Sequence, residues 1–161
     1  MIPDGWSTCD LSDAHGDAAR VLPPLFRHFG GRSRFSGTVA TVECFEDNSR
    51  VKEQLNTPGE GRVLVVAGGG SIRCALLGDT IGGEAVAAGW AGVVLDGCVR
   101  DTAALATLDL GVLAIGVVPR RSLKNGQGVA GGPVEVAGIP CVPGDLLFAD
   151  EDGVVLLPAG S

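Results

Sequence analysis

The middle of the chain carries Arg62-Val63-Leu64-Val65-Val66-Ala67, in which an arginine is followed by five apolar residues, three of them β-branched valines. A continuous run of this kind is typical of a strand buried on both faces. Similar runs follow at residues 90–97 and 110–116, and the intervening segments 81–89 and 102–107 have helical character. This alternation predicts an α/β fold with a parallel βαβ centre.

The sequence before this centre predicts one more strand and two helical segments. Residues 36–44 alternate with a period of two, which indicates a strand. The pair Asp47-Asn48 is typical of a helix cap and predicts a helix over 49–56. Residues 10–28 are expected to form a helical lead-in, which Pro23-Pro24 interrupts.

The end of the chain has a different pattern, with paired apolar runs around tight turns. Residues 134–137 and 139–142 flank a glycine, and residues 146–149 and 154–157 flank a turn that ends in Asp152-Gly153. An Asp-Gly pair supplies the positive φ that a hairpin turn needs. We therefore predict antiparallel C-terminal hairpins beside the parallel centre.

The composition limits the class of protein. The chain has 161 residues, 45% hydrophobic and 19% charged, with a mean hydropathy of +0.32, which excludes disorder and suffices for one domain over 1–161. No apolar run reaches the ~18 residues of a membrane span. Residues 1–6 lack the features of a signal peptide, and the 5 cysteines are widely spaced. We expect a cytoplasmic protein that does not bind membranes.

The net charge of −7, with 12 basic against 19 acidic residues, argues against nucleic acid as a direct partner. The nearest approach to a basic patch is Arg120, Arg121 and Lys124. Three charges in a polar loop are expected to be solvated, with a phosphate or partner site as the alternative. His15 and His28 lie far in sequence from the centre, and we expect them to be surface or packing residues.

Candidate functional residues follow two strands of the predicted parallel sheet, where ligands of α/β folds bind. Gly78, Asp79, Thr80 and Ile81 stand at the start of a predicted helix. The free N–H groups and the positive dipole end there suit a carboxylate. The alternative is that Asp79 or Thr80 merely caps the helix.

The next strand is followed by Arg100 and Asp101. The guanidinium of Arg100 suits a carboxylate or an enolate oxygen. Asp101 is suited to a hard divalent cation, or it caps the helix that it opens. Because adjacent parallel strands end at the same edge, we expect Asp79, Arg100 and Asp101 to meet. Mg²⁺ often takes one or two protein carboxylates and keeps several waters, which leaves room for a chelating 2-oxo acid.

Nucleotide motifs are absent. Gly68-Gly69-Gly70 is not followed by the third glycine of the dinucleotide fingerprint, and there is no Gly-Lys-Ser/Thr sequence.

Over nearly its whole length the chain resembles the family that contains class II 4-hydroxy-4-methyl-2-oxoglutarate aldolases and regulator of ribonuclease activity A. The resemblance rests on several blocks that occur in the same order. They are Phe29-Gly30-Gly31-Arg32, Phe45-Glu46-Asp47-Asn48, Gly68-Gly69-Gly70-Ser71, Ala75-Leu76-Leu77-Gly78-Asp79, Gly89-Trp90-Ala91-Gly92, Gly97-Cys98-Val99-Arg100-Asp101, Pro143-Gly144-Asp145 and Ala149-Asp150-Glu151-Asp152-Gly153.

The resemblance implies a swivelling β/β/α domain, assembled as a homotrimer or a dimer of trimers, that cleaves C–C bonds of small 2-oxo acids to give pyruvate. By motif match, the backbone N–H groups of residues 78–81 would bind the pyruvyl carboxylate and Arg100 would bind the substrate. Asp101 would hold Mg²⁺ or Mn²⁺, and Asp79 would position the water that protonates the pyruvate enolate.

Two departures favour oxaloacetate decarboxylation over aldol cleavage. Ala104 stands where aldolase-competent relatives carry an acid, and the sequence stops at Ser161, short of their acidic C-terminus. The alternative function is a regulator without catalysis that binds and inhibits ribonuclease E-type enzymes. The presence of Arg100 and Asp101 favours an enzyme.

Overall fold

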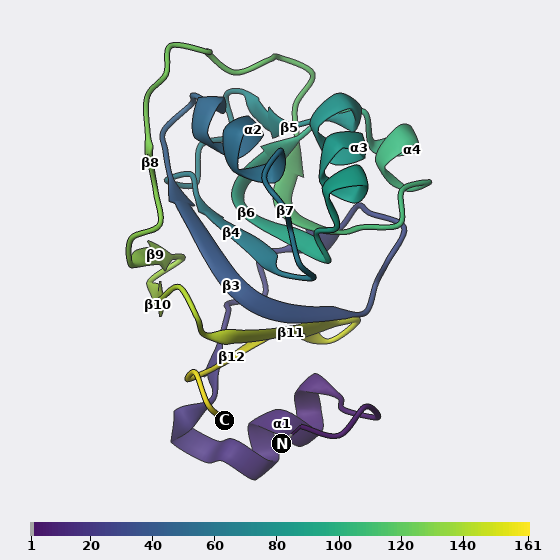
Figure 1. Cartoon of the computed structure of the whole chain (residues 1–161), viewed down its shortest axis with the longest axis vertical. Coiled ribbons are helices and arrows are strands. Elements are labelled where there is room, and N and C mark those ends of the chain that lie inside the picture. Colours follow the sequence, from purple (N-terminus) through teal and green to yellow (C-terminus); the bar gives the residue numbers. More distant parts are fainter. Residues whose placement is uncertain (1) are drawn as a thin grey trace.

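The apolar run at 62–67 forms the buried strand β4, in the middle of a long curled sheet (Figure 1). The computed structural model describes residues 2–161. Along the sheet the strands are β1 (Arg20–Val21), β12 (Gly153–Leu157), β11 (Leu146–Asp150), β3 (Phe35–Glu43), β4 (Val63–Ala67), β6 (Gly92–Val99), β7 (Gly111–Val117) and β2 (Arg27–His28). The helices are α1 (Thr8–His15), the 3₁₀ turn η1 (Gly16–Ala18), α2 (Ser49–Leu55), α3 (Asp79–Ala88) and α4 (Thr102–Leu105).

The centre of the sheet is parallel, as predicted from the alternation of strands and helices. Strands β3, β4, β6 and β7 are neighbours and run parallel. The first half of β6 pairs with β4, and its second half pairs with the short strand β5 (Ala75–Leu77), which follows β4 along the chain. As a result, β5 and β6 end side by side at one edge.

The antiparallel hairpins are confirmed. Strands β11 and β12 pair with each other, and β11 continues the sheet by pairing with β3. The second hairpin, β9 (Val134–Val136) with β10 (Ile139–Cys141), forms a separate ribbon. The fold class is therefore the predicted one: a mixed α/β fold with a parallel centre and antiparallel C-terminal hairpins.

Alternate residues of each strand enter different apolar clusters, which explains why the sheet strands are apolar on both faces. In β4, Val63 and Val65 belong to the cluster inside the curl, whereas Leu64 and Val66 pack under the helices. Helices α2, α3 and α4 cover one part of the outer face, and α1 covers the part formed by β11 and β12 (Figure 1). Each fully buried Val or Leu contributes roughly 1.5–3 kcal/mol of transfer free energy.

The predicted helical lead-in over 10–28 is wrong in its second half. Helix α1 ends at His15 because Gly16 takes a positive φ of 54°. The chain then forms β1 and β2, which flank Pro23-Pro24 and pair with the two ends of the sheet. Two further short strands were not predicted: β5, and β8 (Val129–Ala130), which pairs with β3. In the described part of the chain, no helix is long and apolar enough to cross a membrane.

Candidate functional site

A cavity of about 130 Å³ lies at the edge where β5 and β6 end, beside the start of α3. This volume holds about four water molecules and suits a small organic acid. All the residues proposed from the sequence, 78–81 with Arg100 and Asp101, line it. The complete lining comprises Asn48, Lys52, Ala75, Leu77, Gly78, Asp79, Thr80, Ile81, Arg100, Asp101, Arg121, Ser122 and Lys124.

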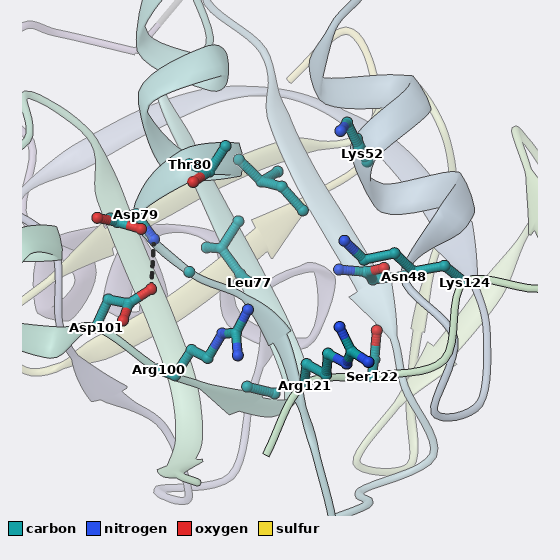
Figure 2. Close-up of a pocket in the computed structure, with 13 residues that line it drawn as sticks. Asn48, Lys52, Leu77, Asp79, Thr80, Arg100, Asp101, Arg121, Ser122 and Lys124 are labelled. Carbon is teal, nitrogen blue, oxygen red and sulfur yellow. Dashed lines mark hydrogen bonds between the residues drawn. The ribbon is translucent and has the colours of Figure 1, made fainter. Parts of the chain in front are cut away.

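The carboxylate of Asp101 faces the first turn of α3 rather than its own helix. Its Oδ2 accepts a hydrogen bond from the backbone N–H of Asp79 at 3.1 Å (Figure 2). Asp101 occupies the N-cap position of α4 without a side-chain cap bond, and Gly78 is the N-cap of α3. Asp79 and Thr80 are therefore not the N-cap of α3, and the Asp101 carboxylate does not cap the helix that it opens.

Gly78 makes this approach possible. A Cβ at this position would lie 2.6 Å from Asp101 Oδ2 and 3.4 Å from Arg100 Nε. Asp101 itself has the left-handed backbone angles φ 59° and ψ 43°, which turn the chain between β6 and α4. The missing side chain and the unusual turn together bring the carboxylate to the helix start.

Arg100 lies in the middle of the pocket, between the two carboxylates and Arg121 (Figure 2). Its backbone N–H donates to Leu77 O at 3.0 Å, which ties the end of β6 to the end of β5. In Figure 2 its guanidinium points into the pocket, with Asp79 and Asp101 on one side and Arg121 on the other. The expected meeting of Asp79, Arg100 and Asp101 is thus confirmed in position, whereas their roles stay predictions.

The wall opposite the carboxylates is cationic. From the sequence, Arg121 and Lys124 are expected to be solvated, with a phosphate or partner site as the alternative, and nothing points to Lys52. Lys52 comes from α2, and Arg121 and Lys124 come from the segment after β7 (Figure 2). Arg121 and Lys124 are exposed as expected, but they belong to the pocket, whereas Arg120 does not line it. No periodicity or motif marks this segment; the one signal was the cluster of basic residues itself.

The cations of the pocket have no carboxylate partners. Across residues 2–161, the side chains of Lys52, Arg100, Arg121 and Lys124 form no ion pair within 4 Å; the ion pairs present are Arg20–Asp145, Arg32–Asp109, Arg50–Glu53 and Arg73–Glu46. Unpaired cations that converge on one cavity, in a chain of net charge −7, indicate an anion-binding pocket.

The residues of the pocket fit a divalent cation in an open site and not in a protein cage. Asp101 is exposed to the cavity, and the hydrogen bond from Asp79 engages only one of its carboxylate oxygens. Nowhere in residues 2–161 do three His, Cys, Asp or Glu side chains gather as a ligand set. Mg²⁺ and similar hard cations are often held by one carboxylate, waters and substrate oxygens.

Other reactive side chains lie outside the pocket. His15 and His28 do not line it, and His28 Nε2 is hydrogen-bonded to Asp150 O at 2.8 Å. Burial raises the pKa of the Cys44 and Cys141 thiols to about 11, so both remain protonated near neutral pH. Both cysteines belong to the buried core.

Comparison with known proteins extends over almost the whole chain. A protein of Xanthomonas campestris pv. campestris (strain B100) named "Putative 4-hydroxy-4-methyl-2-oxoglutarate aldolase" is 56% identical over 154 residues, which cover 96% of this chain and 92% of that protein. The solved structure of the "RNA-processing inhibitor RraA from Thermus thermophilis" matches with a TM-score of 0.93 and 46% identity, covering 97% of this chain and 94% of that one.

A second solved structure, described as "S-adenosylmethionine: 2-dimethylmenaquinone methyltransferase" from Geobacillus kaustophilus HTA426, matches equally well. Its TM-score is 0.93 at 44% identity, with 96% of each chain covered. The family model RraA-like, described as Aldolase/RraA, matches residues 8–156. These matches agree with the fold, and the chain belongs to the RraA-like (Aldolase/RraA) family.

Proposed function

We propose that the protein is a cytoplasmic, divalent-metal-dependent lyase that cleaves a C–C bond of small 2-oxo acids to give pyruvate, with oxaloacetate as the preferred substrate. One observation carries the proposal. The pocket places an available carboxylate, a helix start and Arg100 beside a wall of unpaired cations. A dicarboxylate with a ketone between its ends matches this order: the helix start suits the first carboxylate, Arg100 suits the ketone oxygen, and the cationic wall suits the second carboxylate.

The substrate would lie across the pocket. The backbone N–H groups of the first helical turn lack intrahelical partners, and Thr80 and Ile81 of that turn line the cavity. They would bind the carboxylate next to the ketone, and Arg100 would donate to the ketone oxygen. The second carboxylate would face Arg121 and Lys124.

Decarboxylation then follows from this placement. The bond between the methylene carbon and the second carboxylate breaks, CO₂ leaves, and the electron pair moves onto the ketone oxygen to form an enolate. Arg100 stabilises that developing charge. A proton from a water molecule positioned by Asp79 converts the enolate to pyruvate. A divalent cation held by Asp101 would supply Lewis-acid polarisation of the ketone.

The same pocket suits aldol cleavage less well. Retro-aldol cleavage needs a base that removes the proton of a hydroxyl group, and α4 presents Ala104, which cannot ionise. Loss of CO₂ generates the enolate without that base. The names of the aldolase relatives support lyase chemistry, and Ala104 supports decarboxylation as its main form here.

The test is pyruvate release from oxaloacetate, measured with and without Mg²⁺ or Mn²⁺ and against a control containing the metal alone. We expect Asp101→Asn to lose most of the metal-dependent rate. Asp109→Asn is the matched control, because this exposed carboxylate pairs with Arg32 outside the pocket. The proposal fails if the protein adds nothing to the metal-only rate or if Asp101→Asn keeps full activity.

The regulatory alternative has its own test. The 46% identity to a protein named an RNA-processing inhibitor supports a regulatory function, for which the family resemblance suggests a ribonuclease E-type partner. Such binding would use an outer surface and should survive Arg100→Ala, whereas lyase activity should not. A pull-down and an activity assay on the same variant separate the two functions.

We also propose assembly as a homotrimer. Phe45 and Leu123 leave 57% and 59% of their surface exposed, and both lie next to segments that line the pocket. These two side chains are candidates for a subunit interface, and the number of three subunits comes from the family resemblance. Light scattering of the purified protein measures the number of subunits.

A further inference from the structure

The cationic wall of the pocket is carried by an irregular segment, residues 120–126, here called the cationic arm. Backbone hydrogen bonds fix the arm at its start and in its middle. At the start, Ala75 N donates to Arg120 O at 2.8 Å, which attaches the arm to β5. In the middle, Leu123 N donates to Glu46 O at 2.9 Å and Asn48 N donates to Leu123 O at 3.2 Å. The segment that receives the arm is therefore 46–48.

A buried carboxylate joins these two segments. Asp47 is 1% exposed; its Oδ1 accepts from Ser49 N at 2.9 Å, and its Oδ2 accepts from Asn125 N at 2.7 Å. Beside it, the hydroxyl of Ser49 accepts from Gly126 N at 2.9 Å. Asp47 thus binds the start of α2 with one oxygen and the residue after Lys124 with the other.

The carboxylate is held in its ionised form. Desolvation by burial opposes ionisation, but hydrogen bonds from Ser49 and from the Asn125 backbone outweigh it, and the pKa of Asp47 lies below its ordinary value. Hydrogen bonds to a charged acceptor are roughly twice as strong as neutral ones. A neutral amide at this position would weaken both attachments while keeping the side-chain volume.

The arm has little else to fix its charged side chains. Arg121 and Lys124 are exposed and form no ion pair within residues 2–161, so their position over the pocket depends on the arm backbone. We propose that Asp47 is a positioning residue: it holds the cationic arm over the pocket and thereby sets the preference for 2-oxo acids that carry a second carboxylate. This inference rests on the proposed function and adds a determinant of substrate choice to it.

The expected effect is on capture of the substrate and not on the reaction. The second carboxylate loses its negative charge as CO₂ forms, so cations near it favour binding and do not favour bond breaking. Asp47→Asn should therefore raise KM for oxaloacetate about tenfold, the equivalent of one good charged contact, while kcat does not fall. A loss of kcat with unchanged KM would overturn the inference.

A second pair of variants tests whether Asp47 acts through the arm. In a background with Arg121→Ala and Lys124→Ala, Asp47→Asn should change KM by less than about twofold, because coupled positions are not additive. Lys52 lies on α2 and not on the cationic arm. In a Lys52→Ala background, the full effect of Asp47→Asn on KM should therefore remain. Equal effects of Asp47→Asn in both backgrounds would contradict the inference.

The matched control is Asp150→Asn. Asp150 is also buried, at 5% exposed, and also accepts from a distant backbone N–H, that of Thr8 at 2.8 Å, but it lies outside the pocket. It should leave KM unchanged. Ser49→Ala, which removes the hydroxyl contacts to Gly126 and to the Asp47 carboxylate but keeps the Asp47 charge, is the milder variant if Asp47→Asn does not fold, and it should raise KM in the same direction.

A binding measurement separates this inference from the proposed function. By calorimetry in the presence of Mg²⁺, wild type should bind 2-oxoglutarate, which has a second carboxylate, more tightly than pyruvate, and Asp47→Asn should reduce that ratio about tenfold. If no lyase activity exists but the ratio falls, the proposed reaction is wrong and the role of Asp47 stands. If activity exists and the ratio is unchanged, the role of Asp47 is wrong.

Discussion

The two sides of the pocket are built in different ways. The side with Asp79 and Asp101 is formed by the ends of β5 and β6 and the start of α3, so regular hydrogen bonding fixes each residue. The side with Arg121 and Lys124 is formed by the cationic arm, which a buried side chain attaches to a neighbouring loop. The first arrangement fixes the reacting groups closely, and the second allows the preference for substrates to change without disturbing them.

The substitution with the largest expected effect on kcat is at Arg100, which lies between the two sides of the pocket. Arg100→Ala should lower kcat about 10²–10³-fold, the usual cost of removing one donor from a developing oxyanion. Arg120→Ala is the control, since this arginine at the start of the cationic arm does not line the pocket. The measurement is steady-state oxaloacetate decarboxylation. Similar losses in both variants would show that general positive charge, and not the placement of Arg100, matters.

A smaller effect is expected where the backbone comes closest to Asp101. Gly78→Ala places a Cβ 2.6 Å from Asp101 Oδ2, so the carboxylate must move. We expect kcat/KM to fall about tenfold or more and the metal concentration for half-maximal activity to rise.

Gly83→Ala is the matched control for that variant. It lies in the same helix, and a Cβ there meets nothing within 4 Å. This change should keep activity and stabilise the helix by about 0.5–1 kcal/mol. If both variants behave alike in a metal titration, the close approach at Gly78 has no functional role.

The smallest effect on activity is expected for Asp150→Asn, which should alter stability instead. Desolvation opposes ionisation of Asp150, yet hydrogen bonds from Thr8 and Asp152 outweigh it and lower its pKa. Its contribution to stability is therefore complete above the ordinary pKa of about 3.9 and is lost as the pH falls through the lowered value. At pH 7 the variant should lose about 1–3 kcal/mol in the free energy of unfolding.

Urea unfolding across the acid range measures that contribution. The difference between wild type and Asp150→Asn should narrow as the pH falls below about 4. A difference that stays constant with pH would mean that the charge of Asp150 contributes nothing and that only its shape matters.

The sequence was sufficient to predict the parallel centre and the meeting of Asp79 with Arg100 and Asp101, because neighbouring parallel strands end at the same edge. It was not sufficient for the cationic arm. The bond from Asp47 to Asn125 spans 78 positions and joins two irregular segments, neither of which has a repeating pattern. The lead-in failed for a related reason: β1 and β2 are two residues each and exist only because the sheet offers them partners.

The left-handed backbone at Asp101 narrows the replacements that evolution or protein engineering can use at this position. Glycine, asparagine and aspartate adopt a φ near 59° at the lowest cost, whereas most other residues are strained there by roughly 1–2 kcal/mol. Glutamate would keep the charge but strain the turn, and asparagine would keep the turn but lose the charge. The chemistry of the site requires a carboxylate, and the backbone angle favours aspartate over glutamate. Replacing Asp101 by asparagine therefore costs the charge, and replacing it by glutamate strains the turn.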